Sequence, residues 1–329
     1  MSTSPRISIL GAAEALAQRR VTSDWFDARF GRTAGWAEST TGVAERRFVG
    51  DGQTASQMAE DAARTALARA GIEPGALSAV LGASAVPEQP IPCFAVLVHR
   101  RLGLETTGIP AFDINATCLS FLAALRLAAD QIAAGGWRYV LIVCGDIASA
   151  ALDMDDPETA PLFGDGAAAI VVGPGDGELK AWAFSTYSAG AGAAWLGAGG
   201  SRLPARNLDR LVAESLFRMD GQAAFRVAST HIKPFVDRLL DTAGWDRGML
   251  DLVVPHQASG RALDLMIRRL RLDQQRVIRT IATTGNMVAA SMPAALVRAL
   301  QDGRAGPGSR VMMIGTGAGI SIAGACLVL

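Results

Sequence analysis

The two halves of the chain contain similar segments in the same order. The second copy of each segment follows the first by about 170 residues, which is about half of the 329-residue chain. The matching pairs are residues 77–80 with 250–253, 100–104 with 268–272, and 138–143 with 310–314. One match could arise by chance, but three in the same order indicate an internal duplication. We therefore expect two similar structural units.

Helix-like and strand-like segments alternate within the first half. Residues 54–70 have a helical composition and end at Gly71, and residues 79–85 form an apolar, strand-like run. A second Ala/Leu-rich, helix-like segment, 119–134, precedes the strand-like residues 139–143. The second half repeats this order. Such alternation predicts an α/β fold.

The predicted boundary between the two units lies near Pro174 and Gly175. It divides the chain into residues 1–174 and 175–329. No low-complexity or linker-like stretch separates these parts. The two α/β halves are therefore expected to pack closely against each other.

The balance of charges excludes some classes of partner. The chain has 31 basic and 31 acidic side chains, so no broad electrostatic field favours nucleic acid or an anionic membrane. No apolar run approaches the ~20 residues that span a bilayer, and the first residues lack the layout of a signal peptide. We expect a soluble cytoplasmic protein that binds neither nucleic acid nor membrane.

The four cysteines are Cys93, Cys118, Cys144 and Cys326. They lack C-x-x-C spacing, so neither a metal site nor a disulfide framework is expected. Cys118 differs from the others because it lies directly before the helix-like segment 119–134. A helix N-terminus can lower the pKa of a thiol and make it reactive. The position alone also fits a buried structural thiol.

Asn286 occupies the position in the second half that corresponds to Cys118 in the first. The same offset that aligns residues 100–104 with 268–272 aligns these two residues. Asn286 likewise lies just before a helix-like segment, which runs to about Gln301. A duplicated fold would bring the two helix starts together, so the sequence predicts a site shared by both halves.

The three histidines are His99, His231 and His256. His99 and His231 lie on expected surface helices and are interpreted as ordinary surface residues. His256 directly follows the strand-like residues 251–254 and Pro255. Open α/β sheets place ligand chemistry at the carboxyl ends of their strands. His256 is therefore a candidate for the same site, although a structural role is also open.

Several motifs, taken together, resemble β-ketoacyl-acyl-carrier-protein synthase III of the thiolase superfamily. The similarity runs from about Trp36 to the C-terminus in the family's order. The resemblance implies a duplicated thiolase-like α/β fold, layered α-β-α-β-α, with the nucleophilic cysteine in residues 1–174 and the histidine and asparagine in 175–329. The motifs are Thr-Gly-Val at 41–43, Phe-Gly-Asp-Gly-Ala at 163–167, Pro-His-Gln-Ala at 255–258, Gly-Asn at 285–286, Ala-Ala-Ser-Met-Pro at 289–293 and Gly-Thr-Gly-Ala-Gly at 315–319.

The resemblance implies a decarboxylative Claisen condensation without a cofactor or metal. Cys118 would take an acyl group from a thioester and pass it to a malonyl thioester that loses carbon dioxide. His256 and Asn286 would donate hydrogen bonds to the enolate oxygen, and the backbone N–H groups of Cys118 and Ala318 would form a second oxyanion hole. A papain-like hydrolase is disfavoured because its cysteine motif is absent.

The resemblance also implies residues that bind the substrate. Trp36 would stack on the adenine of coenzyme A, but the arginine that usually covers the other face would fall near Pro157, in an acidic segment. A carrier-protein donor is therefore expected to be preferred. Arg261, Arg268 and Arg269 would dock that acidic carrier, unless they only form a solvated basic face. Ser259 and Arg261 would also line the substrate site.

The resemblance further implies a homodimer in which residues 90–95 approach the partner's acyl pocket. Cys93 or Phe94 would form part of the floor of that pocket. Three other functions remain open for the same fold. They are acyl transfer to an alcohol or amine, head-to-head condensation of two acyl chains, and a non-catalytic partner subunit. The retained Asn286 argues against the first, and Cys118 against the last.

Overall fold

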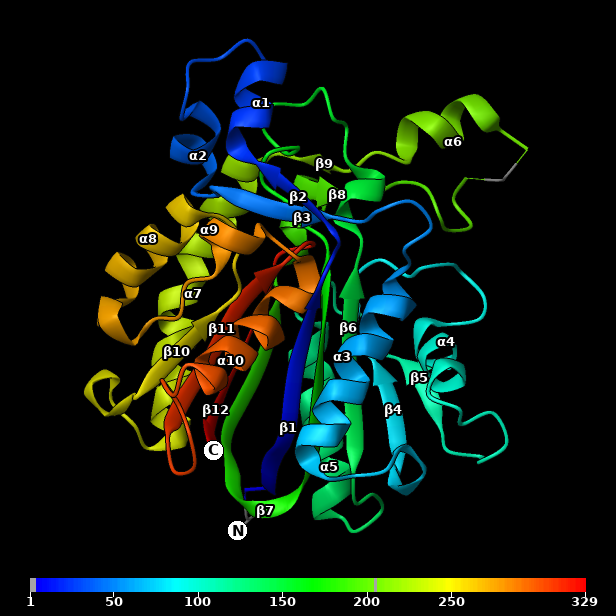
Figure 1. Ribbon diagram of the computed structural model, residues 1–329. Coiled ribbons are helices and arrows are strands. Elements are labelled where there is room, and N and C mark those ends of the chain that lie inside the picture. Colours follow the sequence, from blue (N-terminus) through cyan, green and yellow to red (C-terminus); the bar gives the residue numbers. More distant parts are fainter. Residues whose placement is uncertain (1–3, 204–205) are drawn as a thin grey trace.

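The computed structural model describes residues 4–203 and 206–329. Its centre is an eight-stranded sheet that passes through both halves of the chain (Figure 1). The strands are β1 (Arg6–Leu16), β4 (Ala79–Gly82), β5 (Ala111–Asp113), β6 (Val140–Asp146), β7 (Gly166–Thr186), β10 (Leu252–Pro255), β11 (Arg310–Gly317) and β12 (Ser321–Val328). They follow the order β10-β11-β12-β7-β6-β4-β5, and β1 pairs with β7.

The helices repeat the order that the sequence predicts. They are α1 (Ser23–Arg29), α2 (Trp36–Thr41), α3 (Ala55–Ala70), α4 (Phe94–Arg101), α5 (Ser120–Ala133), α6 (Leu208–Glu214), α7 (Gly221–Ala243), α8 (Gly260–Leu270), α9 (Ile281–Thr284) and α10 (Ser291–Gln301). Helices α3 and α7 both end at a glycine in the left-handed conformation, Gly71 with φ 64° and Gly244 with φ 71°. Only glycine adopts this conformation without steric cost. The matched segments thus fall on equivalent elements, which confirms the duplication.

Alternating side chains along the strands produce the layers. On β6, Ile142 faces an inner core that includes α5 and α10, whereas Leu141 and Val143 face an outer core with α3 and α4. On β11, Met313 faces the same inner core and Met312 faces an outer core with α7 and α8. A strand that is apolar on both faces is typical of a sheet covered on both sides. The α-β-α-β-α arrangement is confirmed.

Strand β7 connects the two halves without a linker. Its first part pairs with β6 and its last part with β12. The predicted boundary at Pro174 and Gly175 falls inside this strand, at three exposed residues, 174–176. The halves are therefore joined by a continuous strand. In the ranges that the structure describes, no helix is both long and apolar enough to cross a membrane.

Two smaller two-stranded sheets lie outside the central sheet. One pairs β2 (Arg19–Thr22) with β3 (Glu45–Phe48), and the other pairs β8 (Ala194–Trp195) with β9 (Arg218–Met219). In β3, the fully buried Arg46 donates from Nη2 to Ser23 Oγ at 3.1 Å and to the Pro161 carbonyl. Burial lowers the pKa of Arg46 to about 10. These bonds connect β3 to the segment that contains Pro161, within the first half.

Candidate active site

Cys118 lies on a tight turn between β5 and α5. The Thr117 N–H donates to Asn115 Oδ1 at 2.9 Å, and Ser120 Oγ donates to the Thr117 carbonyl at 2.6 Å. Thr117 has a φ of 54°, a left-handed conformation that β-branched residues rarely adopt. The hydrogen bonds hold this strained turn, which places Cys118 two residues before the first residue of α5.

The surroundings of Cys118 keep it protonated at rest. Burial raises the pKa of the Cys118 thiol to about 12, and the negative charge of Asp146 acts in the same direction. The backbone N–H groups of Ala318 and of Cys118 itself hydrogen-bond the sulfur and oppose this rise. The prediction that the helix start lowers this pKa is therefore wrong, because loss of solvation outweighs the nearby N–H groups. These two N–H groups are the pair predicted as an oxyanion hole.

His256 directly follows β10, at the carboxyl end of that strand. Its backbone N–H donates to the Ile314 carbonyl of β11 at 2.9 Å. Burial lowers the pKa of the His256 imidazole to about 4, so the ring is neutral at pH 7 and has one N–H to donate. Nδ1 is buried and has no hydrogen-bond partner among the residues that the structure describes. The ring is therefore positioned by its backbone and by packing.

Asn286 lies between α9 and the short 3₁₀ helix η6 (Val288–Ala290). Its Oδ1 accepts hydrogen bonds from the Val288 N–H at 2.9 Å and from Ser291 Oγ at 3.4 Å. Its Nδ2 lies 3.4 Å from the carbonyl of Ala258, two residues after His256. Because the oxygen is held on one side, the amide presents its N–H groups toward the His256 loop.

The end of β11 brings the Cys118 turn and His256 together. A Cβ atom added at Gly315 would lie 2.9 Å from His256 Cβ and 3.0 Å from Leu119 Cδ2. A Cβ atom added at Gly317 would lie 2.6 Å from Thr117 Oγ1. Both approaches are too close for any residue but glycine. The predicted catalytic residues therefore meet at one end of the sheet.

Comparison with known proteins identifies the family. Residues 112–190 match the model of 3-oxoacyl-[acyl-carrier-protein (ACP)] synthase III, and residues 240–329 match the model of its C-terminal part. The beta-ketoacyl-[acyl-carrier-protein] synthase III of Rhodospirillum rubrum is 36% identical over 321 residues, which cover 96% of this chain and 97% of the relative. The chain belongs to the β-ketoacyl-[acyl-carrier-protein] synthase III family. The predicted resemblance is confirmed.

Other synthase III relatives agree over nearly the whole length. The acetoacetyl CoA synthase NphT7 of Streptomyces sp. (strain CL190) is 34% identical over 323 residues and 97% of each chain. The crystal structure of 3-oxoacyl-(acyl carrier protein) synthase III from Pseudomonas aeruginosa PAO1 has a TM-score of 0.88 at 34% identity and covers 98% of both chains. The priming β-ketosynthase of the R1128 polyketide pathway has a TM-score of 0.89 at 30% identity, over 100% of this chain and 98% of that one.

The structure adds a charged residue to this synthase III site that the sequence reasoning missed. Asp146, the last residue of β6, is 1% exposed. Burial raises the pKa of its carboxyl to about 6, against the effect of the backbone N–H groups that bond it. Like His256, Asp146 ends a buried strand at the carboxyl edge of the sheet. A polar residue at the carboxyl end of a buried strand is the sequence signal that could have identified Asp146.

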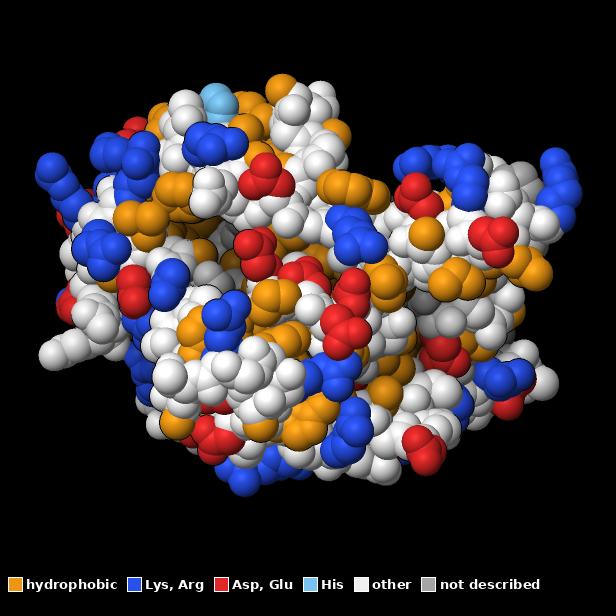
Figure 2. All heavy atoms as spheres, turned by 90° about the horizontal axis from the view of Figure 1, so that it is seen from above, with side chains coloured by type: hydrophobic (Ala, Val, Ile, Leu, Met, Phe, Trp, Pro, Cys, Tyr) orange, Lys and Arg blue, Asp and Glu red, His pale blue; other side chains and the backbone are white. Residues whose placement is uncertain are grey.

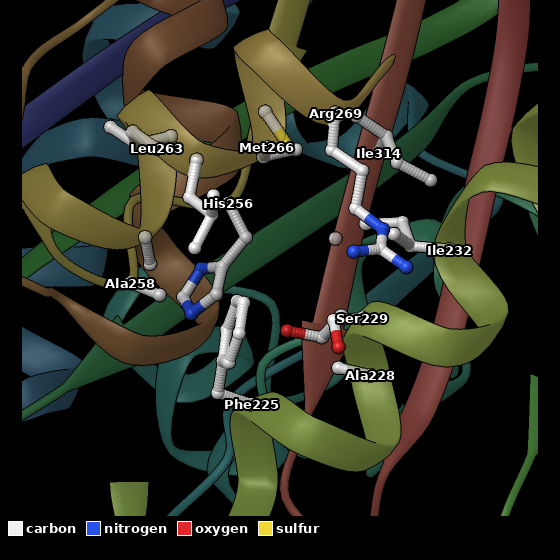
Figure 3. Close-up of a pocket in the computed structure, with 14 residues that line it drawn as sticks. Phe225, Ala228, Ser229, Ile232, His256, Ala258, Leu263, Met266, Arg269 and Ile314 are labelled. Carbon is white, nitrogen blue, oxygen red and sulfur yellow. The ribbon is translucent and has the colours of Figure 1, made fainter. Parts of the chain in front are cut away.

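A cavity of about 80 Å³ reaches His256 from the groove between α7 and α8 (Figure 3). Its wall is mostly apolar and includes Phe225, Ile232 and Met266. Arg269 also lines it, and in Figure 3 its guanidinium points across the groove toward α7. Within 4–203 and 206–329, no group of three or more His, Cys, Asp or Glu side chains could hold a metal ion.

The predicted nucleotide-binding residue Trp36 begins α2 and is half-buried. The guanidinium carbon of Arg32 lies 5.3 Å from the centroid of its ring, and the Phe30 ring packs against it edge-on at 6.0 Å. The sequence reasoning did not find Arg32. Its cation–π contact already occupies one side of Trp36. Figure 2 shows basic and acidic side chains interspersed over this end of the molecule.

The predicted residues on α8 have different surroundings. Ser259 caps the helix, because its Oγ accepts the Ala262 N–H at 3.1 Å. Arg261 donates to the Ser39 carbonyl of α2 at 3.2 Å, so it lies beside Trp36's helix. Arg268 and Arg269 are exposed on the last turn of α8. The three arginines therefore lie on one helix, which starts just after the loop that contains His256.

The prediction that Cys93 or Phe94 forms part of the floor of a partner's acyl pocket stays a prediction, and the structure of this chain shows only how Phe94 packs. Its side chain is 1% exposed and belongs to the outer core with α3. Its backbone N–H donates to Asp113 Oδ2 at 2.9 Å, which fixes the start of α4 against β5. Phe94 follows an exposed loop. In that loop Ile91 is 86% exposed, and Cys93 is half-buried.

Proposed function

We propose that this synthase III catalyses the decarboxylative Claisen condensation of an acyl thioester with a malonyl thioester. The observation that carries the proposal is the meeting of Cys118, His256 and Asn286 at equivalent ends of a duplicated fold. Two backbone N–H groups lie at the Cys118 sulfur, and the Asn286 amide is oriented as a donor. This set supplies a nucleophile and two separate oxyanion sites.

In the first proposed step, Cys118 becomes acylated. Its sulfur attacks the carbonyl carbon of the acyl thioester, and the carbonyl oxygen becomes an oxyanion held by the N–H groups of Cys118 and Ala318. The bond to the donor sulfur then breaks. The departing thiolate takes up the proton that the Cys118 thiol loses. Because the thiolate is the nucleophile, the raised pKa of the resting thiol opposes this step, and the N–H groups of Ala318 and Cys118 at the sulfur reduce that cost.

In the second proposed step, the malonyl thioester loses carbon dioxide. The electron pair of the broken C–C bond forms an enolate, whose oxygen accepts hydrogen bonds from His256 Nε2 and Asn286 Nδ2. The enolate carbon then attacks the acyl-Cys118 carbonyl, and the C–S bond breaks. The Cys118 thiolate takes a proton from solvent, and a β-ketoacyl thioester leaves. Neutral imidazole and amide stabilise this charge without a cofactor or metal.

The direct test of this function is product analysis. The protein is mixed with a panel of acyl thioesters and a malonyl-carrier-protein thioester, and we expect a β-ketoacyl thioester two carbons longer than the acyl donor. Carbon dioxide should appear in equal amount. Acyl transfer to an alcohol or amine would not require the oriented Asn286 amide. An acylated alcohol or amine without carbon dioxide would contradict the proposal.

We further propose that a carrier-protein thioester is preferred over free coenzyme A for at least one substrate. Arg32 covers one side of Trp36, so an adenine would stack on the other side. The acidic segment around Pro157 offers no arginine as a second wall there, and part of the ~0.5–1.5 kcal/mol of an aromatic contact is lost. That corresponds to a loss of at most about tenfold in coenzyme A affinity. A carrier protein docks through its own acidic surface and does not need this ring. The basic side chains that support the proposal are Arg261, Arg268 and Arg269.

Charge reversal at Arg261 and Arg268 tests this preference. We expect kcat/KM with the carrier-linked donor to fall by about tenfold, because rim charges set the rate of encounter, and that with the coenzyme A ester to change much less. Arg238→Glu is a matched control, since Arg238 is exposed on α7 outside this set. Equal losses with both donors would refute the carrier preference. So would a coenzyme A ester that outperforms every carrier thioester.

A homodimer in the cytoplasm is the proposed state of the protein. Strand β5 is the last strand of the eight-stranded sheet, so one of its edges has no paired strand among the residues that the structure describes. Phe112 on this strand is 37% exposed, and Val96 on the neighbouring α4 is 38% exposed. An open edge beside apolar side chains favours pairing with a second copy. Light scattering should give twice the chain mass, and a monomer at micromolar concentration would count against the dimer.

A further inference from the structure

The Asp146 carboxylate connects both halves of the chain at the candidate site. Its Oδ1 accepts the N–H groups of Ala85 at 2.9 Å and Val86 at 3.0 Å, in the loop that follows β4. Its Oδ2 accepts the Ala289 N–H at 3.1 Å, in η6 of the second half. Because this buried carboxylate accepts N–H groups from both halves of the chain, its hydrogen bonds fix the two segments relative to each other.

Two further hydrogen bonds connect the loop that follows β4 to the turn that contains Cys118. Asn115 Nδ2 donates to the Ala85 carbonyl at 3.0 Å, and Ser120 Oγ lies 3.3 Å from the Ser84 carbonyl. Asn115 and Ser120 are the two residues whose side chains hold the strained Cys118 turn. The loop bound by Asp146 is therefore the same loop that holds this turn.

Asp146 is also connected, through Ala289 in the second half, to Asn286, which the proposed function places at the enolate oxygen. Ala289 follows Val288, whose N–H fixes the Oδ1 of Asn286. The side-chain amide of Asn286 therefore fixes one end of the turn 286–289, and Asp146 fixes the other end. A shift of this turn would move the Asn286 donor relative to Cys118.

We propose that Asp146 is a positioning residue that sets the separation between the Cys118 turn and the Asn286 turn. The inference rests on the proposed function, because it assigns the two turns to consecutive steps of one reaction. The titratable groups that face the carboxylate are the thiols of Cys118 and Cys144. After the effect of burial, the negative charge of Asp146 is the second cause that raises the pKa of the Cys118 thiol.

Asp146→Asn tests this role with little change in size. The amide oxygen is expected to stay with the two donors of Ala85 and Val86, so the NH₂ group faces the Ala289 N–H and that bond is lost. Condensation by acylated enzyme should then slow by about 10²-fold, the usual cost of a 1 Å misplacement. Acylation of Cys118 should fall by less than about tenfold, since its turn remains held. Alkylation of Cys118 by iodoacetamide should become faster, because the neighbouring negative charge is gone.

Asp165→Asn is the matched control. Asp165 is also fully buried, and its carboxylate accepts the N–H groups of Val49 and Ser149 and the Ser149 hydroxyl, all from the first half. This variant should lose stability without faster alkylation or a selective loss of condensation. If Asp146→Asn does not fold, the exposed Asn115→Ala cuts the network at the Cys118 end, and acylation should then fall together with condensation.

The outcomes distinguish this inference from the proposed function. A wild-type protein that forms no β-ketoacyl product contradicts the proposed function. The rate at which iodoacetamide alkylates Cys118 can still be compared between the wild type and Asp146→Asn, because alkylation does not require condensation. An unchanged alkylation rate in Asp146→Asn overturns the inference, and so does an equal loss of acylation and condensation. Acylation that survives intact in Asn115→Ala would overturn the link to the Cys118 turn.

Discussion

Replacing Cys118 with alanine should reduce product formation to background, a loss of roughly 10⁶-fold on the scale known for removal of a covalent nucleophile. Cys144 and Cys326 cannot substitute, because both side chains are fully buried in the apolar cores and cannot reach a substrate. Intact-protein mass spectrometry after mixing with an acyl thioester should show one acyl group on the wild type and none on Cys118→Ala.

Cys93→Ala is the control for this experiment. Cys93 is half-buried, as Cys118 is, but it lies at the start of α4. Its removal should leave the acyl mass unchanged. Cys118→Ala should still decarboxylate the malonyl thioester slowly, because His256 and Asn286 are untouched. An acyl mass that persists on Cys118→Ala would contradict the assignment of the nucleophile.

Asn286→Ala and His256→Ala should each slow condensation by ~10²–10³-fold, the usual cost of one oxyanion donor. Acylation of Cys118 should change far less, because the acyl oxyanion is bound by the backbone N–H groups of Cys118 and Ala318. Single-turnover measurements separate the two steps. The first follows acyl loading, and the second follows product release from pre-acylated protein after addition of the malonyl thioester.

Asn286→Asp sharpens this test. The carboxylate keeps the shape of the amide and still accepts from Val288 and Ser291, but it has no N–H to donate. Its loss of condensation should therefore match or exceed that of Asn286→Ala. If His256→Ala abolished acylation yet left malonyl decarboxylation intact, the roles assigned to the two sites would be reversed.

The fold and the three central residues could be predicted because local sequence determines them. The glycines that end α3 and α7, and the apolar strands that follow them, repeat at one offset. The slightly shorter offset that relates residues 100–104 to 268–272 aligns Cys118 with Asn286. Its position after a buried strand made His256 a candidate, and the resemblance to synthase III singled it out. Each of these signals lies within a few residues of the position that it identifies.

Features that depend on contacts between distant segments could not be predicted. The pKa of Cys118 depends on its burial and on Asp146, and neither is visible from a helix start. Arg32 is close to Trp36 in the sequence, but their contact depends on the conformation of the loop between α1 and α2, which composition does not determine. Phe94 follows an exposed loop, but the packing of α3 and α4 buries its ring. The sequence indicates which residues are chemically able to act, whereas burial decides their charge and access.

A chase experiment on the intact protein tests the central claim most directly. Wild-type protein is first acylated and freed from excess donor, and a malonyl-carrier thioester is then added. We expect the acyl mass on Cys118 to disappear while a β-ketoacyl-carrier thioester and carbon dioxide form in a one-to-one ratio. Loss of the acyl group as a free acid or on another acceptor, without carbon dioxide, would contradict the account.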